Sequence, residues 1–206
     1  VQNGLALVQL SGGVVGPVGG GVAVAPTTFT TSNLGSLTLA RTVVRNNNGE
    51  GGVGVYRGGL TLRNSTISDN FGAGIATLST LTITNSTLVR NDIAFNGSSA
   101  LLLNTTLLLV DGEESIGIDA QAGTVTVQNS VIFGDPGDAG CRTALGGVVV
   151  SAGYNAASDA TCPFTETGDQ QGLTVGLAAV QQSGGLPTAA PRLDSPLRNA
   201  IPQGVN

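Results

Sequence analysis

The chain has 206 residues and a formal net charge of −5, and only 10 % of its residues are charged. All eight basic residues are arginines, a charge set that is too sparse and too acidic for a protein that binds nucleic acid. No stretch approaches the roughly 18 consecutive apolar residues that a membrane-spanning helix needs. We therefore expect no nucleic-acid partner and no membrane span.

Residues 1–31 are apolar and rich in glycine, and we interpret them as one long first coil of a repeat structure or as an interaction edge. The segment Leu5–Leu10 could form a strand, and no charged residue precedes Arg41 to protect it. An uncovered apolar strand at the end of a sheet offers open backbone groups to another chain. We predict a polymerisation edge formed by Leu5, Leu7, Val8 and Leu10.

Residues 32–135 contain a short repeat. The segment LTLRNSTISDN at Leu60–Asn70 returns as LTITNSTLVRN at Leu81–Asn91, and weaker copies begin at residues 37, 100 and 125. Each copy has two short runs of alternating apolar and polar residues, which is the periodicity of strands rather than helices. A unit of this length cannot bury its own apolar face and must stack on its neighbours.

These coils have no helical side, which leucine-rich repeats would require. Hydrophobic residues make up 40 % of the chain and aromatic residues only 3 %, so the core must consist of thin aliphatic layers. We predict an all-β fold, a parallel β-helix whose coils cover residues 1–135.

One asparagine occupies the same position in four successive coils. We expect these side chains to hydrogen-bond from rung to rung as a structural ladder, formed by Asn64, Asn85, Asn104 and Asn129. The alternative is glycosylation, since most of them begin Asn-x-Ser/Thr sequons. Asn96 also begins a sequon, lies in a Gly/Ser-rich turn and is the better candidate for a glycan.

A second polar column lies ten residues past the repeat starts, at Asn47, Asn70, Asn91 and Asp135. Beside it, Asp92 and Asp111 fall on adjacent coils, which would place their carboxylates about 4.8 Å apart. Such a pair could share a Ca²⁺ ion, which prefers oxygen ligands. We favour the alternative of two exposed turn aspartates that lean apart, and so we expect no cofactor.

An enzyme that acts on carbohydrates would need carboxylates that converge on one groove, or such a cluster with a basic residue. The only plausible set consists of Asp69, Asp92 and Asp111 with Arg63 or Arg90. The chain has no His or Lys to titrate near neutral pH. It also has no Trp and only two Tyr to stack on sugars. We therefore expect a protein without catalytic activity.

Residues 136–206 have a different character, with further coils and then a proline-rich region. We interpret the last part as a closing segment laid along the solenoid. The two cysteines, Cys141 and Cys162, lie in one irregular region, and a lone pair that closes a loop favours a disulfide and an oxidising compartment. The alternative is two buried free thiols.

The C-terminal residues carry a resemblance. In order, the chain has Cys141, the segment SAGYN at residues 151–155, Asp159, CPFT at 162–165 and TGD at 167–169. Together with the repeats, over about residues 34–202, this order resembles secreted bacterial β-helix proteins of the choice-of-anchor Q type and, more distantly, polymorphic outer-membrane repeat proteins. The resemblance implies an exported right-handed β-helix and no defined catalytic activity.

We therefore predict an extracellular or cell-surface, non-catalytic structural or adhesive protein. An uncovered first strand would let the last coil of one molecule receive the first strand of another, a head-to-tail contact that does not close. The expected partner is another copy of the chain, and the expected product is a surface filament. The alternatives are a β-helix that binds or cleaves glycans and a monomeric adhesin module.

Overall fold

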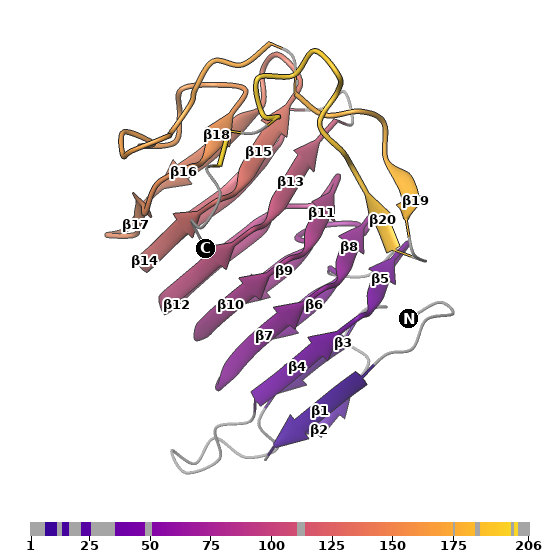
Figure 1. The fold of residues 1–206 in the computed structure, drawn as a ribbon. Coiled ribbons are helices and arrows are strands. Elements are labelled where there is room, and N and C mark those ends of the chain that lie inside the picture. The colour runs from indigo at the N-terminus through magenta and orange to yellow at the C-terminus, as the bar shows by residue number, and fades with distance from the viewer. Residues whose placement is uncertain are drawn as a thin grey trace.

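The computed structural model describes residues 7–11, 14–16, 22–25, 36–47, 51–110, 114–174, 176–183, 186–198 and 200–201. Over these residues the chain winds into a parallel β-solenoid with three sheet faces (Figure 1). The described residues form strands, bridges and turns and no helix. The predicted all-β parallel coil architecture is confirmed.

Each face stacks one strand from every coil. Face 1 consists of β4 (Ser36–Ala40), β7 (Gly59–Arg63), β10 (Thr80–Thr84), the second halves of β12 (Ile93–Leu103) and β14 (Ile116–Gln128), and β17 (Val148–Ser151). Face 2 consists of β5 (Val43–Arg45), β8 (Thr66–Ser68), β11 (Thr87–Val89), β13 (Thr106–Leu109), β15 (Val131–Gly134) and β18 (Ala156–Ala157). Face 3 consists of β3 (Val22–Ala25), β6 (Val53–Val55), β9 (Ile75–Thr77), the first halves of β12 and β14, and β16 (Ala139–Thr143).

The repeat fixes the register between coils. Leu60 pairs with Leu81, as the sequence copy requires, and the same column continues through aliphatic residues in every coil. These side chains are buried at the centre of the solenoid: Leu37, Leu60, Leu81, Ala100, Val125 and Val149. Each fully buried Leu contributes about 1.5–3 kcal/mol to folding, so a stack of thin layers provides a sufficient core without many aromatic rings.

Two corners share one local plan. Corner 1 joins face 1 to face 2, and corner 2 joins face 2 to face 3. At both corners a strand ends, one residue adopts the left-handed conformation, and the next residue turns a polar side chain inward. Residues in that conformation include Asn64 (φ 49°) and Asn85 (φ 48°) at corner 1, and Asp69 (φ 55°) and Arg90 (φ 49°) at corner 2. The left-handed residue at each of these positions ends one strand and turns the chain into the strand of the next face.

The described residues of 1–31 do not pair as one parallel coil, which was one of the two interpretations of this segment. In the part of this region that the structure describes, β1 (Leu7–Ser11) pairs antiparallel with β4, and β2 (Val14–Gly16) pairs antiparallel with β3. Only β3 joins the parallel stack, through β6. The chain thus enters the solenoid through reversed strands.

The C-terminal region closes the solenoid in two places. We call residues 158–173 the cap, because they cover the last coil, and the described residues of 176–192 the strap, because they cross face 2. The strap contains the antiparallel pair β19 (Gln181–Ser183) and β20 (Leu186–Thr188), and the Thr66 hydroxyl of β8 donates to the carbonyl of Pro187 at 2.9 Å. Figure 1 shows β19 and β20 alongside β8 and β5. The described residues of the strap thus lie along the solenoid.

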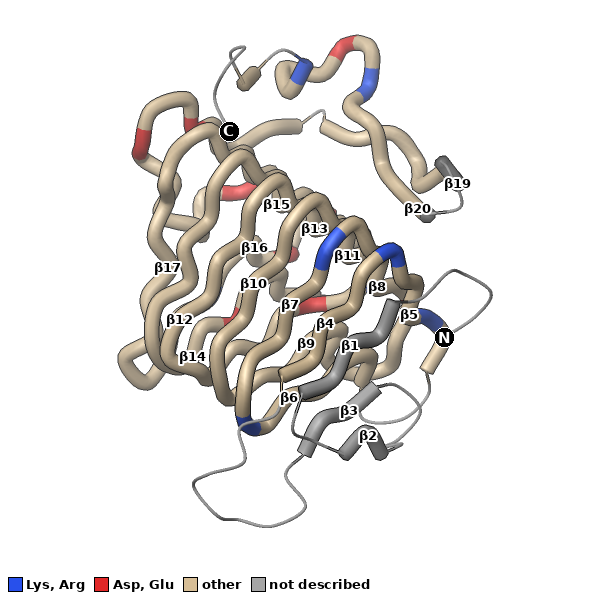
Figure 2. The backbone as a smooth tube through the Cα atoms, turned by 60° about the horizontal axis from the view of Figure 1, so that its bottom comes forward, with Lys and Arg blue, Asp and Glu red and all other residues tan. Residues whose placement is uncertain are grey.

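The predicted disulfide is also confirmed. It joins Cys141 on β16 to Cys162 in the cap, across a sequence separation of 21 residues. Cys162 and Phe164 are buried with the core residues, so the cap extends the hydrophobic interior beyond the last coil. Figure 2 shows how few charged residues the stacked coils carry.

Candidate functional site

The asparagines predicted as a ladder form the turn residues of corner 1. Asn64, Asn85 and Asn104 are exposed with positive φ, and Asn129 shares the conformation but is buried. One bond of the predicted kind is present, from the Asn104 amide to the Asn85 carbonyl oxygen at 3.1 Å. Asparagine is suited to this position because its short polar side chain tolerates the left-handed conformation. The column therefore exists mainly for backbone geometry.

The buried ladder at corner 1 consists of the next residue in each coil. The hydroxyl of Ser65 accepts the Thr42 N–H at 3.0 Å, and the hydroxyl of Ser86 accepts the Ser65 N–H at 3.1 Å. The pattern resumes where Ser130 accepts from Thr105 and Asn155 from Ser130. All of these residues are buried, so each acceptor oxygen, three hydroxyls and the side-chain amide oxygen of Asn155, provides the partner that a buried backbone N–H needs.

Corner 2 carries a ladder of asparagine side chains. The Asn70 carbonyl oxygen accepts the Asn47 side-chain amide at 2.6 Å, and the Asn91 carbonyl oxygen accepts the Asn70 side-chain amide at 2.8 Å. Asn70 also donates to the carbonyl of Val44. Asn70 and Asn91 are buried. The sequence showed this column by its spacing but gave no sign that it, rather than the Asn64 column, faces inward.

The predicted calcium pair is only half described. Asp111 lies outside the described residues, whereas Asp92 directly follows the corner 2 ladder. Asp92 is half-buried and accepts the Gly74 N–H at 3.2 Å, so it is not the exposed turn residue that we favoured. Burial raises the pKa of Asp92 above its ordinary 3.8, and the nearby Asp119 charge adds to this rise. Within the described residues no group of three or more His, Cys, Asp or Glu side chains could hold a metal ion.

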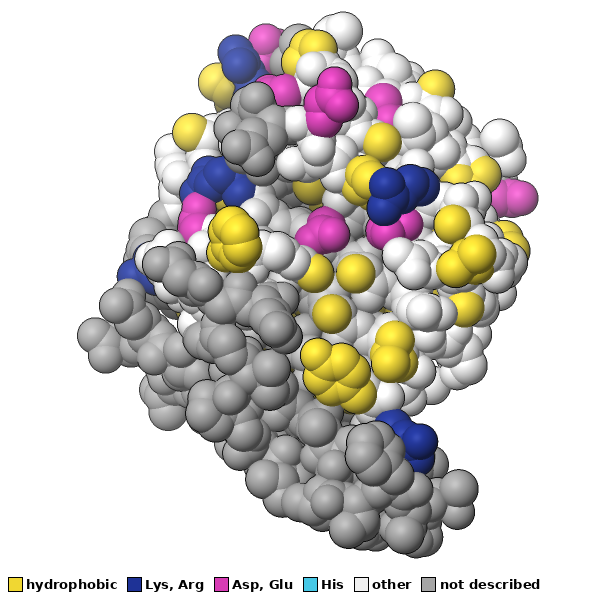
Figure 3. All heavy atoms as spheres, turned by 180° about the vertical axis from the view of Figure 1, so that it is seen from behind, with side chains coloured by type: hydrophobic (Ala, Val, Ile, Leu, Met, Phe, Trp, Pro, Cys, Tyr) yellow, Lys and Arg dark blue, Asp and Glu magenta, His cyan; other side chains and the backbone are white. Residues whose placement is uncertain are grey.

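An ion pair lies near Asp92 on face 3. The guanidinium of Arg142 donates to both carboxylate oxygens of Asp119, at 3.0 and 2.7 Å, and the Gln121 amide adds a third bond at 3.0 Å. The Arg142 hydrogen bonds hold the pKa of Asp119 below its usual range. In register with this pair, the outward positions of the preceding strands are small: Gly54, Ala76 and Ala94. Figure 3 shows this side of the molecule, with acidic and basic side chains above a group of hydrophobic ones.

The glycan candidate Asn96 lies next to the small outward residues Ala76 and Ala94 of face 3. Asn96 is exposed and belongs to β12, at an irregularity in the pairing with β14. It lines a hollow of about 160 Å³ with Tyr56, Leu78 and Gln121. The sequence predicted a turn at Asn96, and the strand here instead runs on through the irregularity.

The carboxylates considered for catalysis are separated by their surroundings. Asp69 forms an ion pair with Arg90 and lines a hollow of about 550 Å³ over face 2. Asp92 lines a different hollow, of about 420 Å³, that also contains Phe71 and Arg90. Arg63 ends a strand of face 1. The two described carboxylates therefore line different hollows, and Arg90 lines both.

The two ends of face 1 differ in their cover. The predicted edge residues Leu7, Val8 and Leu10 belong to β1, the outermost strand at one end, and Leu5 lies outside the described residues. At the other end, β17 pairs only with β14 among the described strands. Its outward side chains are apolar and exposed, 48 % at Val148 and 41 % at Val150.

The other two faces are covered at the last coil. On face 2 the cap residue Gln170 bridges to Ala156, and on face 3 cap side chains accept two N–H groups of β16. Within the described part of the chain, the last coil therefore offers an open edge on face 1 rather than the whole open cross-section that the head-to-tail prediction assumed. Among the described residues, no helix is long and apolar enough to cross a membrane.

The comparisons with known proteins agree with this architecture. No curated protein and no solved structure gave a significant match to the chain. A family model described as right handed beta helix region matches residues 25–160, which is more than half of the chain and spans most of the coils described above. The coils are thus right-handed, and the chain belongs to the right-handed β-helix family.

Proposed function

We propose that this protein is a non-catalytic structural element, exported to the cell surface or beyond, whose copies join end to end through face 1. The observation that carries the proposal is the edge of β17. This strand has exposed apolar side chains and, among the described strands, pairs only with β14, on a coil whose other two faces are covered. Such an edge is a template for another strand.

The opposite end of face 1 supplies a strand to fill it. β1 is antiparallel to β4, whereas the other strands of face 1 run parallel to one another. If copies stack along the solenoid axis, β1 of one copy meets β17 of the next in antiparallel orientation. Face 1 would then continue from copy to copy by strand addition, which provides main-chain hydrogen bonds as well as apolar contact. A contact of this type does not close on itself and leads to filaments.

The resemblance to secreted choice-of-anchor Q proteins and the disulfide support export, because disulfides persist in oxidising compartments. Adhesion by monomers is the simpler variant of the same proposal. In that variant β17 would contact a host or matrix protein instead of another copy.

Glycan binding is a second candidate, and the hollow at Tyr56 favours it. A phenol ring, two amide side chains and a floor of small residues form a surface on which one sugar ring could stack and hydrogen-bond. A glycan array would test this candidate directly, with Tyr56→Ala as the variant that should lose any signal.

Two lysine substitutions distinguish strand pairing at the β17 edge from non-specific apolar association. Val150→Lys places a charge on the free edge of β17. Leu101→Lys is the matched control, because Leu101 lies in the same outward column of face 1 and is similarly exposed, 37 % against 41 %, but belongs to the interior strand β12. In sedimentation velocity, we expect Val150→Lys to abolish concentration-dependent association and Leu101→Lys to preserve it. Equal behaviour of both variants would contradict edge pairing.

A further inference from the structure

The outward side of face 1 carries two columns of side chains in register, which we call the face 1 array. The first column runs from Ser36 to Val148, and the second runs from Thr38 to Val150. No register shift interrupts either column along the six strands. Eight of the twelve positions carry a hydroxyl group: Ser36, Thr38, Thr61, Thr80, Thr82, Ser99, Thr124 and Thr126.

The threonine hydroxyls of the array are available to a ligand, unlike the hydroxyls at corner 1. Ser65 and Ser86 at that corner are buried and accept backbone N–H groups of the preceding coil. All six threonines of the array are at least partly exposed. Within the described part of the chain, none of their side-chain hydroxyls bonds to another protein group. Each of these hydroxyls can therefore bond to water.

The array is evenly spaced and rigid. Successive coils lie about 4.8 Å apart, and alternate residues along one strand lie about 6.6 Å apart. Threonine is branched at Cβ, which restricts its χ1 rotation. The inward neighbours Leu60, Leu81 and Val125 are fully buried and hold the strands in place. Each threonine therefore presents a hydroxyl and a methyl group at a repeated position.

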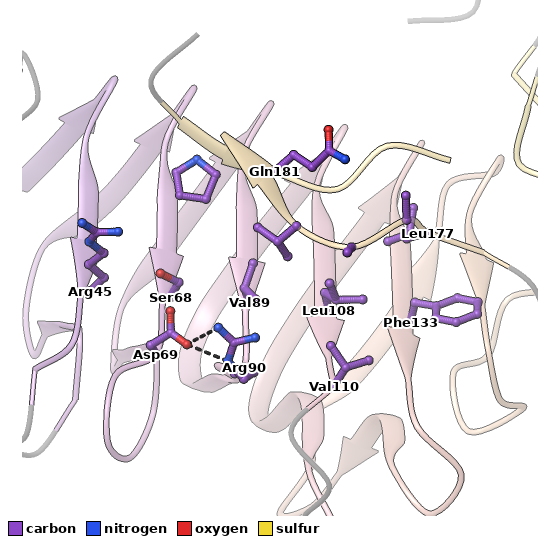
Figure 4. Close-up of a pocket in the computed structure, with 14 residues that line it drawn as sticks. Arg45, Ser68, Asp69, Val89, Arg90, Leu108, Val110, Phe133, Leu177 and Gln181 are labelled. Atoms are coloured by element: carbon purple, nitrogen blue, oxygen red, sulfur yellow. Dashed lines mark hydrogen bonds and ion pairs between the residues drawn. The ribbon is translucent and has the colours of Figure 1, made fainter. Parts of the chain in front are cut away.

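Face 1 differs from the other two faces in what its outward side carries. The strap lies over face 2 (Figure 4), and the Asp119–Arg142 ion pair lies on face 3. No charged side chain belongs to the face 1 array, although Arg63 lies beside it at the end of β7. Among the described residues, face 1 is thus the face with an uncharged, repeating lattice of hydroxyl and methyl groups.

We propose that the face 1 array binds the surface of an ice crystal. Ice holds water molecules at fixed, repeating positions, and the spacing of about 4.8 Å between coils is close to the repeat of water along one axis of hexagonal ice. Each hydroxyl donates to and accepts from water at the crystal surface. The methyl groups between the hydroxyls limit the orientations of the same water molecules. Because the side chains are already ordered, binding costs little side-chain entropy.

A repeating ligand accounts for the array better than a single soluble one does. A small molecule is bound by a concave site with a few convergent polar groups, whereas these hydroxyls lie on six successive strands and point outward in parallel. The proposal does not depend on assembly through β1 and β17, because the array lies on the outward side of the sheet and not at its edges.

Slow growth of ice from a dilute solution of the intact chain tests the proposal. A protein that binds ice is incorporated into the crystal, whereas other solutes remain in the liquid. We expect the chain to enter the ice while a soluble protein of similar size, mixed into the same solution, stays behind. Exclusion of the chain together with this internal control would overturn the proposal, whatever other crystalline surface the chain binds.

Matched lysine substitutions then place the ice-binding surface. Thr82→Lys puts a charge at the centre of the array, on the interior strand β10, and should abolish incorporation into ice. Thr143→Lys is the control, because Thr143 is an exposed threonine of β16 on face 3 and should leave incorporation unchanged. Circular dichroism checks that both variants are folded, and sedimentation velocity should show the same association for Thr82→Lys as for the wild type. If folded Thr82→Lys enters the ice, or if both variants are excluded equally, the array is not the binding surface and the proposal fails.

Discussion

Corner 1 and corner 2 of the solenoid link neighbouring coils through different buried polar side chains. Both follow a left-handed residue with a buried polar one, yet corner 1 uses hydroxyls that each accept one backbone N–H of the preceding coil, whereas corner 2 uses amides that also bond to each other. Each rung of the hydroxyl ladder is independent of the last. An amide ladder is cooperative, so a change in one member affects both neighbours.

The largest effect is expected at the centre of the amide ladder. Asn70→Ala removes the bonds of its side chain to Asn47, Val44 and Asn91 and leaves several buried groups without partners. We expect a loss of about 2–4 kcal/mol in the free energy of unfolding, measured by denaturant titration. Asn64→Ala, at an exposed position of corner 1, is the comparison. A loss at Asn70 no larger than that at Asn64 would show that the amide ladder adds nothing.

A smaller effect is expected in the hydroxyl ladder. Ser65→Ala leaves only the Thr42 N–H without its partner, at a cost of about 1–2 kcal/mol. Ser65→Thr provides the control, since threonine occupies the same ladder position at residues 42 and 105. The threonine variant should retain wild-type stability in the same titration. If alanine and threonine behave alike, the hydroxyl is not what stabilises this corner.

The turn residue itself should contribute less than the ladder behind it. Asn85 has φ 48°, a conformation that costs an alanine about 1 kcal/mol and a glycine almost nothing. We therefore expect Asn85→Ala to lower the thermal midpoint slightly and Asn85→Gly to leave it near the wild-type value. The reverse order would mean that the Asn104 to Asn85 side-chain bond, and not the backbone, explains this asparagine.

The smallest effects are expected from the carboxylates beyond corner 2, and they depend on pH. Because burial raises the pKa of Asp92, ionisation costs the folded state more than the unfolded one as pH rises above 3.8. Asp92→Asn should therefore stabilise the protein at pH 7, with the gain fading below pH 3.8. Denaturant titrations across this pH range measure the difference.

Asp119→Asn should show the opposite sign. The pKa of Asp119 is lowered by Arg142, so the ionised pair stabilises the fold above the ordinary pKa of 3.8. The substitution should destabilise the protein at pH 7, and the loss should shrink as acid protonates Asp119 in the wild type. The same sign for both variants would contradict the different surroundings that the structure gives these two residues.

The corners also explain which features the sequence could predict. The sequence copies that begin at Leu60 and Leu81 predicted the strands, the coil and the register, because two near-identical segments stack with equivalent residues side by side. Two asparagine columns were visible, at Asn64 and at Asn70, but which one faces inward depends on a backbone angle that composition does not reveal. The cysteine pair was predictable because the chain contains no other cysteine.

Other features depend on contacts between distant segments. No sequence repeat indicates that β1 pairs antiparallel with β4. The hollow of about 550 Å³ between face 2 and the strap needs the strap to lie over Leu108 and Phe133, and no pattern in residues 176–192 indicates which face they cross. Asp119 and Arg142 form an ion pair because they are in register on adjacent strands, across an irregular spacing that hides the column.

Negative-stain electron microscopy of the purified chain, across a range of concentrations and with and without a chelator, tests the central claim that copies join through face 1. We predict unbranched filaments one solenoid wide, which Val150→Lys abolishes and Leu101→Lys does not. Filaments that dissolve with chelator would show that an ion, with Asp92 and Asp111 as its candidate ligands, also supports the contact. Closed dimers, or monomers at all concentrations, would contradict end-to-end assembly.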